Sequence, residues 1–177
     1  MPGCELLVAG GPAKARLRQD CDYRQIAKLA GQLGVAGRVR FSGRVSHQDM
    51  PAIYRSADLV VSVPWHGPSG LVPLEAMACG KPVVASAVGG HPDAVADGTT
   101  GVLVPPRQPE MLAQRIRDLL ASPMLCQGLG IAAADRAVAR YSWDRIGQET
   151  LTAYSRVLQA HPRRPMAATA RGRRTAR

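Results

Sequence analysis

Short apolar runs alternate with amphipathic stretches along most of the chain, beginning near residue 3. Apolar runs rich in β-branched residues are typical of strands, whereas apolar residues spaced three and four apart predict helices. Strands that alternate with helices in this way indicate βα units stacked around a parallel sheet. The pattern therefore predicts an α/β fold, a Rossmann-like parallel sheet with flanking helices.

Turn residues and spacing place the individual elements. Strands are expected at 4–10, 38–41, 57–63, 82–86 and 101–106, and helices over 20–33, 50–57, 71–79, 109–120, 125–140 and from 143 onward. The start of the helix near residue 50 stays open, because Ser46 and Asp49 suggest a capping box while Pro51 favours a later first turn. The strand at 57–63, ADLVVSV, is continuously apolar, so we expect it in the centre of the sheet.

The positive charge of the chain is concentrated at its C-terminal end. The chain has 177 residues and a formal net charge of +10, and residues 161–177 hold six arginines and no acidic residue. The other 160 residues carry 17 basic and 13 acidic groups. We therefore expect one domain over 1–160 and a disordered basic tail over 161–177. The alternative role of the tail is weak contact with anionic membranes.

The composition excludes several other classes of protein. No apolar run approaches the ~20 residues that cross a bilayer, and MPGCELLVAGGP lacks the basic n-region of a signal peptide. The four cysteines are scattered without a C-x-x-C pair, which argues against a zinc or redox site. No aromatic interleaving accompanies the basic tail, so we expect no specific nucleic-acid binding. The sequence predicts a cytoplasmic protein without a metal centre.

The stretch GPSGLVPLEAMACG, at residues 67–80, carries the most chemical information. A helix that starts after Gly70 leaves the amides of Gly70, Leu71 and Val72 without acceptors in the helix, and such amides bind anions. The pair Gly89-Gly90 is a second candidate cradle for phosphate. We therefore expect an anion site at the carboxyl ends of the parallel strands.

Glu75 lies four residues after Leu71, on the same helical face and one turn below the expected anion site. A carboxylate at this place repels phosphate but accepts hydrogen bonds from a diol. Diphosphate at the helix start and ribose hydroxyls on Glu75 together suit a nucleotide. The simpler interpretation of Glu75 is a solvated charge on a helix surface.

Several motifs of the chain together resemble a known family. They are FSG at 41–43, LEAMACGKPVVAS at 74–86, the glycine pair at 89–90, DGTTGVLVPP at 97–106 and YSWDRI at 141–146. On these motifs the chain closely resembles, over about residues 5–158, the C-terminal donor-binding half of family 4 (group 1) retaining glycosyltransferases. The resemblance implies the C-terminal half of a GT-B fold and transfer of a sugar with retention.

The resemblance also implies which residues bind the nucleotide. Glu75 matches the second glutamate of the E-x7-E motif, which binds the ribose of the donor. Gly70, Leu71 and Val72 match the amides that hold the diphosphate. Ser42, Gly43 and Arg44 match the loop beside the base. The implied substrate is a UDP-, GDP- or ADP-sugar, with no further cofactor and no required metal. No catalytic residue is assigned.

The sequence departs from the family pattern in three places. The donor-sugar loop consists of His66, Gly67, Pro68 and Ser69, in which Gly67 replaces the first glutamate of the motif and Ser69 replaces a common aromatic residue. A first βα unit, which carries an Arg and a Lys on the diphosphate, is missing. The N-terminal half that binds the acceptor is missing as well, so we expect it in cis or in trans, for an acceptor that the sequence does not identify.

Two classes of function stay open on the sequence. The first is the donor-binding half of a glycosyltransferase, which we expect to be inactive as this chain alone. The alternative is a non-catalytic, truncated or decayed remnant that binds nucleotides. A hydrolase is disfavoured, because a nucleophilic Ser69 would need glycine where the chain has Leu71. His66 and His91 either approach the cleft or lie on the polar surface, and Tyr54, Trp65 and Trp143 are expected at the core or its edge.

Overall fold

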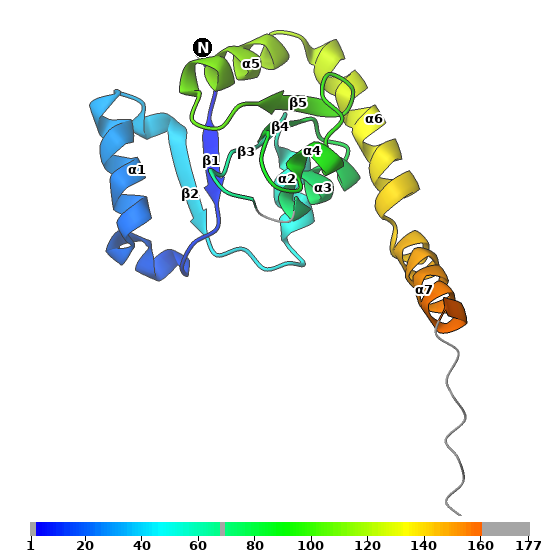
Figure 1. The fold of residues 1–177 in the computed structure, drawn as a ribbon. Helices are drawn as coiled ribbons and strands as arrows, with labels where there is room; N and C mark the ends of the chain where they lie inside the picture. Colours follow the sequence, from blue (N-terminus) through cyan, green and yellow to red (C-terminus); the bar gives the residue numbers. More distant parts are fainter. Residues whose placement is uncertain (1–2, 68–69, 161–177) are drawn as a thin grey trace, which may run out of the picture. The chain divides into compact units, whose positions relative to one another are not determined.

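The computed structural model describes residues 3–67 and 70–160 (Figure 1). By its internal contacts the chain divides into two compact units, 1–139 and 140–177. The predicted tail at 161–177 lies outside the described residues, as do Pro68 and Ser69 of the donor-sugar loop.

The first unit contains two parallel sheets. In one, β1 (Leu6–Ala9) pairs with β2 (Val39–Gly43). In the other, β4 (Val83–Ser86) lies between β3 (Val60–Ser62) and β5 (Gly101–Val104). The predicted α/β class, with parallel strands and flanking helices, is confirmed.

The position of β3 differs from the sequence-based expectation. Among the described strands it pairs only with β4, so it is an edge strand, whereas the prediction placed it in the centre of the sheet. All four residues of β4 are buried, but all three residues of β3 are only half-buried. Strands bonded on both sides and covered on both faces are normally the continuously apolar ones. The apolar character of β3 therefore exceeds what its position in this sheet explains.

The two-stranded sheet is covered by α1 (Cys21–Gln32), which follows the short 3-10 helix η1 (Lys14–Gln19). The carboxylate of Asp20 caps α1 by accepting a hydrogen bond of 2.9 Å from the backbone N–H of Tyr23. The ring of Tyr23 meets that of Phe41 on β2 edge to face, with centroids 4.6 Å apart. A second 3-10 helix, η2 (Ala36–Arg38), leads into β2. Tyr23 of the predicted first helix therefore packs on the sheet, whereas Ile26 and Leu33 are 38% and 65% exposed.

The main core surrounds the three-stranded sheet. Its two faces are covered by α2 (Met50–Ser56), α3 (Leu71–Ala78), α4 (His91–Ala94), α5 (Pro109–Leu120) and α6 (Pro123–Tyr141). Val83 and Ala85 of β4 belong to one buried cluster with Met77, and Val84 belongs to the other with Leu119. This alternation is expected, since successive side chains of a strand point to opposite faces.

The start of α2, left open by the sequence, is settled by the local hydrogen bonds. The helix begins at Met50 with Asp49 as its N-cap and Pro51 in the first turn. Ser46 Oγ donates to the carboxylate of Asp49 at 2.6 Å, and the Asp49 N–H donates to Ser46 Oγ at 3.2 Å. The two polar residues therefore close the turn that precedes the helix.

The second unit contains α7 (Trp143–Ala160), and none of its described residues is buried. Trp143, which the sequence analysis expected at the core or its edge, is 85% exposed. That expectation was wrong, because the apolar face of α7 has no layer of this unit to pack against among residues 140–160. No helix in the described part of the chain is long and apolar enough to span a membrane.

Candidate functional site

The glycine-rich turn before α3 packs directly on the glycine pair that follows β4. A Cβ atom on Gly67 would lie 2.7 Å from Gly89 Cα, and one on Gly70 would lie 2.9 Å from the carbonyl oxygen of Gly90. Gly70 also has a φ of +74°, which side-chain-bearing residues rarely adopt. The structure thus joins the two glycine motifs that the sequence analysis treated as separate candidate cradles.

Ser86, at the end of β4, holds the same two loops together. Its hydroxyl donates a hydrogen bond of 2.8 Å to the carbonyl of Pro64, in the loop after β3. Its own carbonyl lies 2.9 Å from Nδ1 of His91, so Nδ1 carries the proton of that imidazole. His91 is completely buried, with no hydrogen-bond partner for Nε2 among the described residues, so the surface alternative was wrong. His66, by contrast, is exposed.

The start of α3 is partly exposed to solvent. Gly70 is the N-cap, and its carbonyl accepts the first helical hydrogen bond, from Leu74 at 3.2 Å. The amides of the first turn have no acceptor within the helix, and they form the positive end of its dipole. Leu71 and Val72, whose amides lie in this turn, are 60% and 44% exposed. Gly70, the third residue whose amide the sequence analysis selected, is buried.

Glu75 is held one turn further along α3 by Tyr54 of α2. The phenol of Tyr54 donates a hydrogen bond of 2.8 Å to Oε2 of Glu75, and Nδ1 of His47 lies 3.9 Å from Oε1. Burial, and then this hydrogen bond, raises the pKa of Tyr54 well above its usual range. Tyr54 is 5% exposed, as expected for a core aromatic, while the Glu75 side chain is 35% exposed. Glu75 is therefore a partly accessible, oriented acceptor rather than a freely solvated charge.

The loop expected beside the base packs on the turn after β1. Gly43 has a φ of +69°, and a Cβ atom there would lie 2.9 Å from the carbonyl oxygen of Pro12. The Arg44 N–H donates to the same carbonyl at 2.9 Å, and Ser42 Oγ donates to the carbonyl of Gly43 at 2.8 Å. These contacts shape the loop but do not join it to α3. The chain runs on from this loop to His47, which lies beside Glu75.

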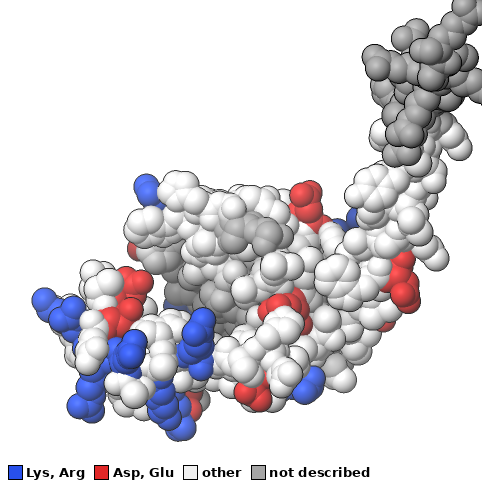
Figure 2. Space-filling view, turned by 90° about the horizontal axis from the view of Figure 1, so that it is seen from below, with Lys and Arg blue, Asp and Glu red and all other residues white. Residues whose placement is uncertain are grey.

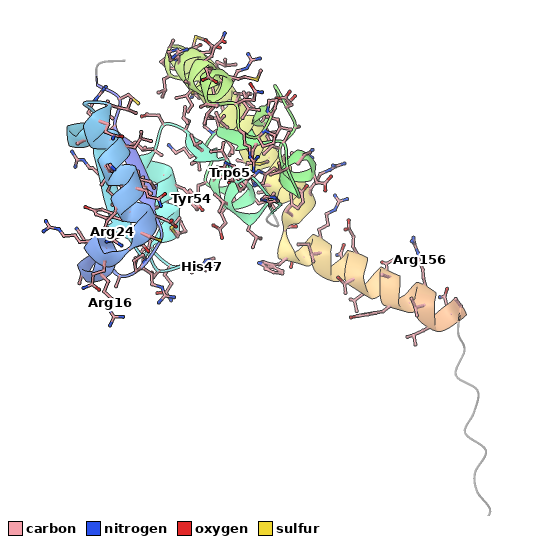
Figure 3. All side chains as sticks on the ribbon, turned by 60° about the vertical axis from the view of Figure 1, so that its left-hand side comes forward. Arg16, Arg24, His47, Tyr54, Trp65 and Arg156 are labelled. Atoms are coloured by element: carbon pink, nitrogen blue, oxygen red, sulfur yellow. The ribbon has the colours of Figure 1, made fainter. Side chains whose placement is uncertain are left out.

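Basic side chains gather elsewhere on the first unit. Figure 2 shows them over η1 and α1, where the exposed basic residues are Lys14, Arg16, Arg18, Arg24 and Lys28. Arg16 and Arg24 point away from Tyr54 and His47 (Figure 3). No group of three His, Cys, Asp or Glu residues that could hold a metal ion occurs within 3–67 and 70–160.

A separate apolar pocket of about 630 Å³ lies at the carboxyl end of β3. Val63, Trp65, Val104 and Leu112 are among the residues that line it, whereas Glu75 is not. Trp65 is 64% exposed, so the expectation that it lies at the core or its edge was wrong. The guanidinium of Arg107 instead stacks over its ring, 4.7 Å from the centroid. Sequence reasoning missed this pocket, because its walls come from segments about 40 positions apart.

Comparison with known proteins gives a consistent family assignment. Residues 2–136 match the family model described as Glycosyl transferases group 1. D-inositol 3-phosphate glycosyltransferase of Mycobacterium tuberculosis is 40% identical over 162 residues, which cover 89% of this chain and 32% of that protein. The chain therefore spans about a third of the length of this curated relative.

Solved structures with the same fold include enzymes of sugar transfer. Sucrose-phosphate synthase from Thermosynechococcus elongatus matches with a TM-score of 0.80 at 35% identity, over 90% of this chain and 40% of that one. Anabaena HepE in complex with UDP matches with a TM-score of 0.79 at 28% identity, over 88% of this chain and 42% of HepE. The C-terminal domain of LpcC, a glycosyl transferase group 1 family protein from Francisella tularensis, matches with a TM-score of 0.66 at 26% identity. The match covers 78% of this chain and 70% of that domain.

Proposed function

This chain belongs to the family Glycosyl transferases group 1, as part of the C-terminal half of a GT-B fold, and we propose that it is the donor-binding half of a retaining glycosyltransferase. In this proposal it binds a nucleotide-sugar such as a UDP-, GDP- or ADP-sugar. The complementary half, in cis or in trans, binds the acceptor. The sugar passes from the nucleotide to that acceptor.

One observation carries the proposal: Glu75, an acceptor oriented by Tyr54, lies one turn beyond the start of α3 on the same helix. The first-turn amides of α3, from Gly70 to Val72, suit the diphosphate, because they combine unpaired donors with the positive end of the helix dipole. Glu75, oriented by Tyr54, suits the two ribose hydroxyls, which donate to a carboxylate. The spacing of the two features along one helix fits a nucleoside diphosphate.

The site also suits the chemistry of the leaving group. When the bond from sugar to diphosphate breaks, negative charge develops on the diphosphate. Amides that are already oriented stabilise that charge without reorganising, which is the usual source of such a rate enhancement. Close packing of Gly70 on the Gly90 backbone leaves the first residue of this turn little room to move. The proposal therefore needs no metal ion at the diphosphate.

The solved relatives support a nucleotide-sugar as the ligand. Anabaena HepE, 28% identical to this chain, is described in complex with UDP, with UDP and glucose, and with UDP-glucose. That description concerns HepE, and its extension to this chain is part of the proposal. A cytoplasmic location and weak contact of 161–177 with anionic membranes belong to the proposal as well.

A second candidate function is nucleotide binding without sugar transfer. It is favoured by Gly67, where the resemblance places a glutamate that contacts the donor sugar. Because a side chain at this position would collide with the Gly89 backbone, the present loop cannot regain that contact by a single substitution. A chain of this kind would hold the nucleotide without orienting its sugar.

The direct test of the proposal compares nucleotides with nucleosides. Titration calorimetry of the 177-residue chain is expected to show binding of at least one of UDP, GDP and ADP. The corresponding nucleoside is expected to bind at least about tenfold more weakly than its diphosphate. The difference measures the contribution of the diphosphate. If no nucleoside diphosphate binds, or if nucleoside and diphosphate bind equally, both candidate functions are wrong.

A further inference from the structure

The helix α7 exposes an apolar face that no described residue of its own unit covers. Six large apolar side chains of this helix are between 38% and 85% exposed: Trp143, Ile146, Leu151, Tyr154, Val157 and Leu158. None of the residues 140–160 is buried. Most of the stability of a protein helix comes from packing of its apolar face, so α7 needs a partner surface. The family model ends at residue 136, so the match does not describe this face.

The face follows a seven-residue repeat. Two positions of the repeat form one continuous stripe along the 18 residues of α7, and they are filled by Trp143, Ile146, Thr150, Ala153, Val157 and Ala160. A stripe with this period keeps facing the same neighbour when two helices wind around each other. The pattern therefore indicates that α7 pairs lengthwise with another helix.

A second copy of α7 fits this stripe in an antiparallel arrangement. When Thr150 of one copy lies opposite Ala153 of the other, the pairing repeats with two-fold symmetry along both helices. The facing residues are then Trp143 with Ala160, Ile146 with Val157, and Thr150 with Ala153. The small pair lies at the centre, where it lets the two backbones come close, and both outer layers contain a bulky residue. This distribution suits helices that cross near their midpoints.

A parallel arrangement fits the same residues less well. Identical side chains would face each other in every layer, with Trp143 against Trp143 at one end and Ala160 against Ala160 at the other. Layers of such unequal volume leave crowding at one end and a gap at the other, and both cost stability. The antiparallel pair also places the positive start of one helix beside the negative end of the other. Two copies of α7 are therefore expected to run in opposite directions.

Charged side chains along one flank of the stripe support the same register. Glu149 and Arg156 each precede a stripe residue by one position, so they lie on the same flank. In the antiparallel pair the Glu149 of each copy comes beside the Arg156 of the other, which gives two ion pairs. The Glu149 side chain is 64% exposed although it contacts Arg145 of its own helix at 2.8 Å, and Arg156 projects from α7 (Figure 3). Both charges are therefore accessible to a second copy.

Two further features favour a second copy as the partner. Residues 143–160 contain two acidic and two basic side chains, so two copies of α7 bring no net charge together. On the other flank of the stripe, Tyr154 of one copy lies opposite Gly147 of the other, where the absence of a side chain leaves room for the ring. The sequence of α7 is thus complementary to itself in size and in charge.

We propose that α7 is a dimerisation surface, through which two copies of this chain pair in an antiparallel arrangement centred between Thr150 and Ala153. Because the contact is one short helix on another, the dimer is expected to be weak, with a dissociation constant roughly in the micromolar range. The pairing uses only residues of the second unit and does not depend on the candidate nucleotide site.

Sedimentation velocity of the full 177-residue chain, over about 1 to 200 µM, tests the proposal. The average mass is expected to rise toward twice that of the monomer as the concentration increases. Val157→Asp is expected to weaken the dimer at least about tenfold, because each copy then buries a charge in the apolar stripe. A chain that stays monomeric over the whole range would show that the face serves another partner and that the proposal is wrong.

Gln148→Asp is the matched control for this substitution. Gln148 lies on the face of α7 opposite the stripe, so the variant introduces the same charge into the same helix without touching the contact. It is expected to dimerise as the wild type does. Val157 is 60% exposed, so neither variant is expected to unfold the chain, which circular dichroism verifies. Equal dimerisation of the two variants would contradict the proposal.

Exchange of the two flanking charges tests the direction of the helices. Glu149→Arg and Arg156→Glu each place like charges side by side in the antiparallel pair, and each is expected to weaken it about threefold or more. The double variant restores opposite charges between the copies and is expected to dimerise more tightly than either single variant. Glu149→Arg loses the contact with Arg145 in both backgrounds, so the recovery reports on the second copy. A double variant as weak as the weaker single variant would overturn the antiparallel pairing.

Discussion

The phenol of Tyr54 donates a hydrogen bond of 2.8 Å to Oε2 of Glu75 and so links α2 to the helix that carries the candidate nucleotide site. The two residues are 21 positions apart in the sequence. Because Tyr54 is buried and its pKa is raised, it stays protonated and serves as a donor over the whole neutral range. Tyr54 is therefore a positioning residue for Glu75.

Tyr54→Phe is expected to weaken UDP binding by about three- to tenfold, since the loss of one hydrogen bond to a charged group leaves Glu75 less well oriented. Titration calorimetry measures the change. Tyr154→Phe, on the exposed α7, is the matched control and is expected to leave the affinity unchanged. Equal affinities for wild type and Tyr54→Phe would show that Tyr54 has no positioning role.

Gly70→Ala is expected to destabilise the chain more than Gly80→Ala, by about 1–3 kcal/mol. Both glycines have a similar positive φ, +74° and +72°, so the cost of the backbone conformation cancels in the comparison. A Cβ at Gly70 collides with Gly90, whereas one at Gly80 meets nothing within 4 Å. Urea denaturation gives both free energies of unfolding. Similar losses for the two variants would mean that the contact between the glycine loops is not tight.

Gly67 is expected to make the donor's sugar a minor contributor to binding. UDP-sugars should bind no better than UDP, because glycine stands at the position where the resemblance places a glutamate that contacts the sugar. Gly67→Glu is expected to lose stability, and not to gain a preference for any UDP-sugar, since its Cβ would lie 2.7 Å from Gly89 Cα. Calorimetry with a panel of UDP-sugars is the measurement. A UDP-sugar that binds wild type tenfold tighter than UDP would identify a different sugar contact.

The local structure of the chain was largely predictable, and its long-range contacts were not. Periodicity reports which residues share a face within a few turns, so α1, α3 and α5 appear close to their expected places. It does not report which element packs against which, so the edge position of β3 and the contact of Gly67 with Gly89 were not foreseen. The short α4 was missed as well, because four residues are too few to show a helical period.

The candidate site was predictable where it lies on one helix. Gly70 to Val72 and Glu75 belong to a single stretch of α3, so spacing alone placed the carboxylate below the open amides. The contribution of Tyr54 required the tertiary structure, and so did the burial of His91. The sequence was least informative about the burial of aromatic residues. Trp65 and Tyr54 were both expected at the core or its edge, but they are 64% and 5% exposed.

The 177-residue chain alone is expected to show no sugar transfer. Transfer requires donor and acceptor to be oriented together in a cleft with little water, and such orientation is worth about 7–11 kcal/mol of the barrier. Incubation with nucleotide-sugars and with sugar, lipid and polyol acceptors, followed by mass spectrometry, tests this expectation. Product that forms with turnover and is lost in Glu75→Ala would show that the chain is a complete catalyst.

The central claim, that one helix binds diphosphate at its start and ribose at Glu75, is tested most directly by titrating wild type and Glu75→Ala with UDP and with pyrophosphate. The substitution removes hydrogen bonds to a charged acceptor, so UDP is expected to bind about tenfold or more weakly. Pyrophosphate has no ribose and is expected to bind the variant at least as well as wild type, because a nearby negative charge is removed. Glu110→Ala, at an exposed position of α5, is the control and is expected to change neither affinity. Equal UDP affinity in wild type and Glu75→Ala, or parallel losses for UDP and pyrophosphate, would contradict the claim.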